Sequence, residues 1–171
     1  MPLSRIQSES MNLGDDFAFT GTITGAGGGK VLQFLNFPFS TEVSTTSTSF
    51  VSLGSPAIQG TITPTSASSK ILIRFSCSTY MGNSTQSSYV TLYRGTVASG
   101  THLGDGTEGM SRIYESNSAV VTEHTFEFVD SPNTTNATTY QVGFKSSTTS
   151  NPKRFVMNDT PCEMIIMEIA Q

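Results

Sequence analysis

The residues that can carry out chemistry are few and widely spaced in this sequence. His102 and His124 are its two histidines, and Cys77 and Cys162 are its two cysteines. Neither the Cys-x-x-Cys nor the His-Glu-x-x-His spacing of zinc sites occurs, and no Gly-x-Ser-x-Gly motif marks a nucleophilic serine. We therefore expect no metal site, no cofactor and no catalytic residues, and we interpret the protein as a non-enzyme.

The cysteines and His124 fit packing roles. Cys77 lies on the apolar face of a predicted strand, and Cys162 follows a proline beside the last predicted strand. No cation or base adjoins either cysteine in sequence, so we expect both to be unbridged packing residues rather than nucleophiles. His124 shares a strand face with two phenylalanines, at 126 and 128. That pattern predicts a buried or subunit-interface histidine rather than a metal ligand.

Tyrosines and acidic loop residues form a candidate carbohydrate site. Tyrosine rings can stack on sugars, and carboxylates can accept hydrogen bonds from sugar hydroxyls. The candidate residues are Tyr80, Tyr89 and Tyr93 together with Asp105 and Glu108, which lie in a glycine-rich loop at 95–109. The alternative is that the tyrosines line sheet surfaces or subunit contacts and that the acids keep an exposed loop soluble.

A glycine-rich run at 25–30 has only a superficial likeness to a phosphate-binding loop. The motif Gly-x4-Gly-Lys-Ser/Thr needs a first glycine where Thr24 stands, and a hydroxyl after the lysine where Val31 stands. The run also leads into a predicted strand rather than into a helix, whose N-terminus would bind phosphate. We interpret residues 25–29 as a flexible hinge.

Composition narrows the class of protein. The chain has 171 residues, which fits one domain with a sizeable core. Lys and Arg number 9 against 13 Asp and Glu, giving a net charge of −4, and this argues against nucleic-acid binding. No apolar run reaches the roughly 18 residues that span a bilayer, so we expect no membrane partner.

The elements that position these residues are predicted to be strands. Alternating apolar and polar residues, separated by turn signals, indicate strands near 31–39, 48–53, 58–63, 70–80, 87–94, 111–115, 119–129, 140–144, 154–157 and 163–169. No long helical pattern occurs among them. The sequence therefore predicts an all-β fold: a single jelly-roll-like antiparallel β-sandwich, the knob, at 30–171, preceded by an extended N-terminal arm and its hinge at 1–29.

Two sets of apolar residues are expected to make contacts between chains. The arm cannot fold alone, so its apolar residues are available to fill pockets on a partner. These are Leu3, Ile6, Met11, Leu13, Phe17 and Phe19. The strand at 31–39 is apolar on both faces, with Val31, Leu35 and Phe37 on one and Leu32 and Phe34 on the other. A strand of this kind usually lies between layers or subunits, which predicts a homotrimer interface.

The knob resembles a domain in structural proteins of tailed bacteriophages, especially marine ones, of the fibre-like or tail-fibre type. The matching stretches are KVLQ at 30–33, STTSTSF at 44–50, ITPTSASSKILI at 62–73, LYRG at 92–95, FVDSP at 128–132, TTYQV at 138–142 and MEI at 167–169. The start, MPLSRIQ at 1–7, is also similar to the N-termini of phage fibre proteins.

The resemblance implies a component of the virion surface, a homotrimer whose arm docks on capsid or tail proteins and whose knob points outward. Longer family members carry a shaft before the knob, so the 29 residues here favour a compact head decoration, head fibre or short tail fibre. No catalytic residues come with the resemblance. The alternative function is a tail adhesin that binds a glycan on the host surface.

Overall fold

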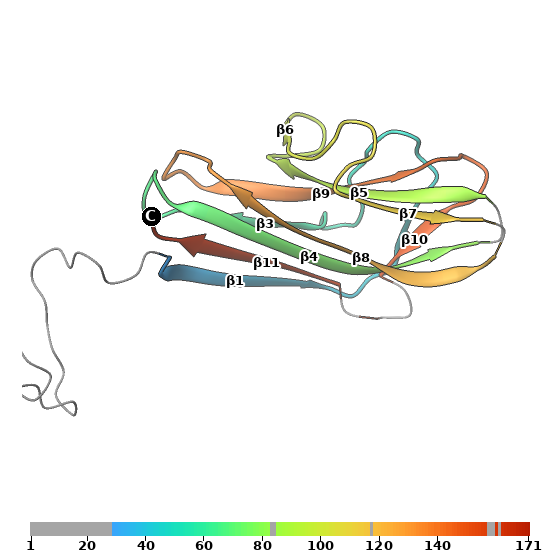
Figure 1. Cartoon of the computed structure of the whole chain (residues 1–171), viewed down its shortest axis with the longest axis horizontal. Helices are drawn as coiled ribbons and strands as arrows, with labels where there is room; N and C mark the ends of the chain where they lie inside the picture. Colours follow the sequence, from blue (N-terminus) through green and yellow to red (C-terminus); the bar gives the residue numbers. More distant parts are fainter. Residues whose placement is uncertain (1–28, 83–84, 117, 157–159, 161) are drawn as a thin grey trace, which may run out of the picture.

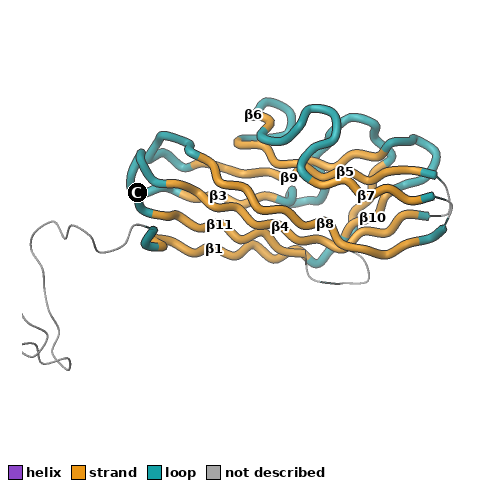
Figure 2. Tube along the Cα trace, in the orientation of Figure 1, coloured by secondary structure: helices purple, strands orange, loops and turns teal. Residues whose placement is uncertain are grey.

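The computed structural model describes residues 29–82, 85–116, 118–156, 160 and 162–171. These form eleven strands and no helix (Figure 2). The strands are β1 (Val31–Phe39), β2 (Val43–Thr45), β3 (Gln59–Ile62), β4 (Lys70–Met81), β5 (Gln86–Arg94), β6 (Thr101–His102), β7 (Ser111–Glu115), β8 (Val120–Asp130), β9 (Thr138–Ser146), β10 (Lys153–Phe155) and β11 (Cys162–Ile169). None of the described residues belongs to a helix that is long and apolar enough to cross a membrane.

The strands form two antiparallel sheets that pack face to face (Figure 1). The long strands of sheet A lie in the order β1-β11-β4-β8, and the short strands β10 and β2 continue from β4 on its β11 side. Sheet B has the order β3-β9-β5, and β6 and β7 both pair with β5.

The connectivity of the eight principal strands is that of a jelly roll. In chain order β1, β3, β4, β5, β7, β8, β9 and β11, the first strand pairs with the eighth, the second with the seventh, the third with the sixth and the fourth with the fifth. Folding one long hairpin over itself in this way gives the two sheets of a jelly roll. The prediction of an all-β jelly-roll-like sandwich is confirmed.

The core lies between the sheets and is built by alternation along the strands. In β4, Ile71, Ile73, Phe75 and Cys77 point inward and are fully buried. The same pattern on β11 extends this side of the core, and β5 and β9 of sheet B supply the opposite side. Since successive residues of a strand point to opposite faces, the intervening residues form the outer faces of the sandwich.

Strand β1 follows this alternation over most of its length. Leu35 and Phe37 pack against the core, whereas Leu32 and Phe34 are exposed. The prediction that Val31 shares the face of Leu35 and Phe37 is wrong, because the pairing register shifts between Val31 and Gln33. Such a bulge turns the preceding residue over. Val31 pairs with Ile169, as Phe34 pairs with Met167.

The prediction of a strand at 48–53 is also wrong. That segment makes an isolated bridge from Val51 to Phe144, and the extended strand in this region is the three-residue β2, just before it. Ser and Thr side chains bond to nearby backbone in the segment, for example Ser47 with Ser49. These local bonds compete with pairing between strands.

Candidate functional site

The outer face of sheet A carries a contiguous apolar surface. One row of side chains crosses β1, β11, β4 and β8, because each residue in it is the cross-strand partner of the next. The row consists of Phe34, Met167, Leu72 and Val129, in that order. Neighbouring rows add further apolar residues. We define the apolar face of sheet A as Val31, Phe34, Leu72, Val129, Ile165, Met167 and Ile169.

The ends of this face are the most accessible to solvent. Phe34 is 58% exposed and Val31 49% exposed on β1, and Val129 is 54% exposed on β8. The residues between them, on β11 and β4, are half-buried by their neighbours. Fully burying one such side chain is worth about 1.5–3 kcal/mol. An exposed apolar surface that crosses four strands is typical of an interaction site.

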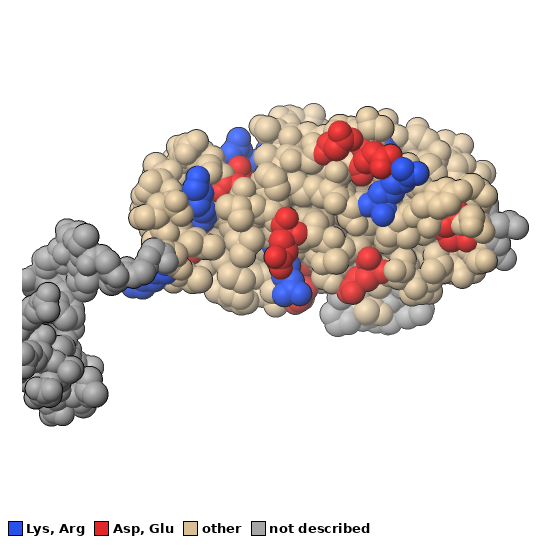
Figure 3. Space-filling model, viewed as in Figure 1, with Lys and Arg blue, Asp and Glu red and all other residues tan. Residues whose placement is uncertain are grey.

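Charge is sparse on and around the apolar face of sheet A. The next row contains one ion pair, with Arg74 Nε 3.6 Å from Glu127 Oε1, and both side chains are more than half exposed. In Figure 3 the charged side chains stand singly or in small groups, with wide uncharged areas between them. An exposed pair of this kind contributes little to stability, about 0–1 kcal/mol.

The candidate carbohydrate residues fall on two different faces. Tyr89 and Tyr93 lie on the outer face of sheet B, on β5, and the loop that carries Asp105 and Glu108 follows β6, which pairs with β5. Tyr80 lies on β4 in sheet A, with the Arg154 guanidinium 4.6 Å from its ring centroid. The structure therefore brings four of the five residues to one sheet and separates the fifth.

Two cationic side chains, which the sequence analysis did not single out, lie over the Tyr89 ring on sheet B. Lys145, Tyr89 and Arg112 are cross-strand neighbours on β9, β5 and β7. Lys145 Nζ lies 4.4 Å from the centroid of the Tyr89 ring, and the Arg112 guanidinium lies 5.6 Å from it. Sequence offered no signal for this cluster, because it depends on which strands pair and in which register.

The Tyr93 ring is also covered. His102 stacks on it, with centroids 4.5 Å apart and an angle of 9° between the planes. Burial lowers the pKa of His102, and its Nε2 lies 2.7 Å from the Thr91 hydroxyl. On this face, Tyr114 keeps an accessible ring, with 58% of the residue exposed.

The acidic loop residues are held by the loop itself. Asp105 Oδ1 accepts hydrogen bonds from the backbone N–H groups of Glu108 and Thr107, at 2.6 and 2.8 Å, and these bonds lower the pKa of Asp105. Glu108 pairs with Arg112 at 2.8 Å. Both carboxylates therefore have partners within the protein.

The buried titratable groups are inaccessible to substrates. His124 lies between the Ser88 and Ser111 hydroxyls, at 2.9 and 2.8 Å, and burial lowers its pKa to about 3. It is fully buried, as predicted. Cys77 and Cys162 are free and fully buried, and the Cys77 thiol together with burial raises the pKa of Cys162. His124, Cys77 and Cys162 therefore contribute to packing of the core. Among the described residues, no group of three His, Cys, Asp or Glu side chains can hold a metal ion.

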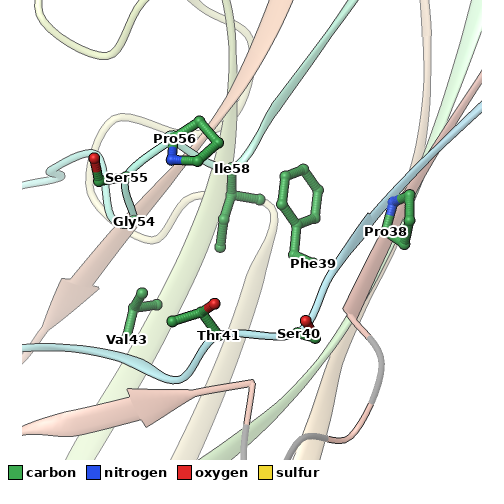
Figure 4. A pocket seen from close by; sticks show the side chains of 9 residues that line it. All are labelled: Pro38, Phe39, Ser40, Thr41, Val43, Gly54, Ser55, Pro56 and Ile58. Carbon is green, nitrogen blue, oxygen red and sulfur yellow. The ribbon is translucent and has the colours of Figure 1, made fainter.

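A groove runs along the open side of the sandwich, between β1 and β3. One end is a pocket of about 180 Å³, lined by Pro38, Phe39, Val43, Pro56 and Ile58 with the polar residues around them (Figure 4). The groove continues past Phe37, Gln59 and Gly60. We call this feature the β1/β3 groove. The sequence analysis did not anticipate it, since it depends on which strands end up at the sheet edges.

The remaining candidates lie outside the described residues. These are the six apolar residues of the arm: Leu3, Ile6, Met11, Leu13, Phe17 and Phe19.

Comparison with known proteins finds similarity in structure rather than in sequence. No protein-family model matches the sequence, and no curated protein matches it. A chain in a structure of infectious bursal disease virus, Gt strain, is similar, with a TM-score of 0.42 and 10% sequence identity. The match covers 98% of this chain but 47% of that one, so this chain spans about half the length of the viral chain.

Proposed function

We propose that this protein is a structural component of a virus particle and that its knob assembles with further copies through the apolar face of sheet A. The observation that carries the proposal is the exposed row from Phe34 to Val129. The jelly-roll connectivity and the sequence resemblance to bacteriophage fibre-like proteins favour a virion component. The proposal contains no enzymatic step.

The layout of the apolar face of sheet A suits a closed ring of copies. Its most exposed residues lie on β1 and β8, the outer strands of the four-strand row, so the β1 side of one copy can meet the β8 side of the next. Heterologous contacts of this type generate rings when the rotation closes. Arg74 and Glu127 add one charge of each sign beside the face, and Lys70 is the strand partner of Ile169 within it. We infer a homotrimer, with Val31, Leu32 and Phe34 at the contact and Leu35 and Phe37 supporting it from the core.

The proposal assigns attachment to the arm. Its apolar residues would fill pockets on capsid or tail proteins, and the knob would project from the particle surface. Ordering such a segment costs about 1–2 kcal/mol per residue in backbone entropy, so several anchors per arm are needed. Three arms on one trimer would raise the overall affinity through effective concentration. The most specific form of the proposal is a bacteriophage head decoration, head fibre or short tail fibre.

Light scattering with a matched pair of variants tests the assembly step. The wild type should have about three times the monomer mass of 18.3 kDa at micromolar concentration. Phe34→Ser should weaken each contact roughly ten- to a hundredfold, because the ring is no longer available for burial. Tyr114→Ser is the control, since Tyr114 is equally exposed but lies on sheet B. A wild-type monomer, or equal loss of assembly in both variants, would refute the proposal.

The second candidate function is binding of a host-surface glycan by sheet B. The observation that favours it is that Tyr89, Tyr93 and the loop with Asp105 and Glu108 share that sheet. Cations cover the Tyr89 ring and His102 covers the Tyr93 ring. Tyr114 also has the Arg112 guanidinium 5.9 Å from its ring, but it is the most exposed of the three and would supply the stacking surface. A glycan array should show a signal that Tyr114→Ala removes and Tyr80→Ala, on the other sheet, retains. Absence of any specific signal would leave the structural role alone.

A further inference from the structure

We propose that the β1/β3 groove is the binding site for residues 17–24 of the same chain, which would add as a strand to the free edge of β1. The inference concerns how the arm meets the knob, and it does not depend on a role in a virus particle.

The groove offers both parts of a strand-addition site. Within the described residues β1 pairs with β11 alone and β3 pairs with β9 alone, so each presents one unpaired edge. The exposed backbone N–H and C=O groups of such an edge are a template for another strand. Between the two edges the groove is lined by Phe37, Phe39 and Pro56, which supply apolar surface to the inward side chains of an added strand.

The groove is an open space at the side of the core. At the bottom of the groove the Phe37 ring packs directly against Gly60, since a Cβ on Gly60 would lie 2.6 Å from two atoms of that ring. Beyond that contact, no strand among the described residues lies beside β1 to cover the partly exposed Phe39 from the side of the groove (Figure 4). An added strand beside β1 would place every second side chain over this space.

Residues 17–24 have the sequence that such a strand needs. They read FAFTGTIT, so Phe17, Phe19 and Ile23 alternate with small or polar residues. Eight residues of strand span about 27 Å, close to the roughly 30 Å of the nine-residue β1. Apolar side chains on one face and small polar ones on the other match an edge strand that is buried on one side.

The chain connection favours this occupant over another molecule. Residues 25–30 link the segment directly to β1, and four of them are glycines. A short glycine-containing link between two extended segments is typical of an antiparallel hairpin. Because the link is short, little loop entropy opposes closure. We assign the register that places Phe19 opposite Phe37 and Phe17 opposite Phe39.

This assignment divides the arm into two parts. Phe17 and Phe19 face the knob, and Leu3, Ile6, Met11 and Leu13 are left for contacts with other proteins. The arm would then leave the knob beside β3 rather than at the start of β1.

Hydrogen exchange of the full chain tests the inference. In the wild type, the β1 amides that do not donate to β11 should exchange at least tenfold slower than exposed amides. Phe19→Ser should remove that protection, whereas Phe19→Leu should retain it. Leu13→Ser is the matched control, because it lies in the arm outside the alternating segment, and it should leave β1 protected.

The same measurement separates this inference from self-assembly. Phe34→Ser, which is expected to weaken the contact between copies, should leave the β1 amides protected, and β8 should not respond to Phe19→Ser. The inference is overturned if the free-edge amides of β1 exchange like exposed amides in the wild type, if Phe19→Ser leaves their exchange unchanged, or if Phe34→Ser removes their protection. Light scattering of the same samples reports independently on assembly.

Discussion

Mild acid should destabilise the knob through His124. This imidazole is fully buried between two serine hydroxyls, and burial lowers its pKa to about 3, against about 6.5 in the unfolded chain. Between these values the unfolded state binds a proton that the native state does not. A group with a lowered native pKa of this kind contributes stability above its unfolded pKa and loses it as the pH falls.

The size of the effect follows from the two pKa values. Well below pH 6.5, each pH unit costs up to about 1.4 kcal/mol. Between pH 7.5 and pH 5 the native His124 stays neutral while the unfolded one becomes almost fully charged, so the free energy of unfolding should fall by about 2 kcal/mol. Burial also lowers the pKa of His102, which adds to the loss in the same direction.

Urea unfolding followed by circular dichroism at pH 7.5 and pH 5 provides the assay. His124→Gln removes the titrating group and should reduce the pH-dependent loss, whatever its effect on absolute stability. His102→Gln reports the contribution of the partly buried His102 ring. An NMR titration of wild-type His124 gives a second readout that needs no variant. Equal pH dependence of the wild type and His124→Gln, or a His124 ring that titrates near pH 6.5 in the native state, would refute the reasoning.

Three further predictions concern the packing residues Gly60 and Cys77 and the carboxylate of Glu168, which is buried on β11. Gly60→Ala should cost roughly 1–3 kcal/mol in urea unfolding, because its Cβ meets the Phe37 ring at 2.6 Å, and Gly106→Ala, in open space, should be near neutral. Burial raises the pKa of Glu168, but hydrogen bonds from Thr65 and Gln33 outweigh it and lower the pKa to about 2. Glu168→Gln should therefore cost about 1.5–3 kcal/mol at pH 7 and lose less stability than the wild type between pH 4.5 and pH 2; a cost below 0.5 kcal/mol would contradict the network. Cys77→Ala should cost about 1–2 kcal/mol with assembly retained, and a reducible cross-linked band from the wild type would contradict unbridged thiols.

The strands themselves were predictable because alternation is a local property. The inward positions of β4 can be read from the sequence, since apolar residues recur at every second position from Ile71 to Cys77. The same reasoning placed His124 in the interior. It failed at Val31, because a bulge is set by pairing with β11 and leaves no mark in the local pattern.

The candidate surfaces were predictable only in part, for a physical reason. Phe34 and Val129 are 95 positions apart, and they join one row only because β11 and β4 lie between their strands in the observed register. The pairing of Lys145 and Arg112 with Tyr89 is equally non-local. Sequence spacing describes one strand at a time, whereas a surface depends on which strands are neighbours.

A density map of the assembled protein tests the central claim most directly, because it shows which face of the knob is buried between copies. We predict three copies around one axis, with Phe34 of each copy packed against the Val129 side of the next and the outer face of sheet B open to solvent. A map in which the apolar face of sheet A is open to solvent in every copy would contradict the account.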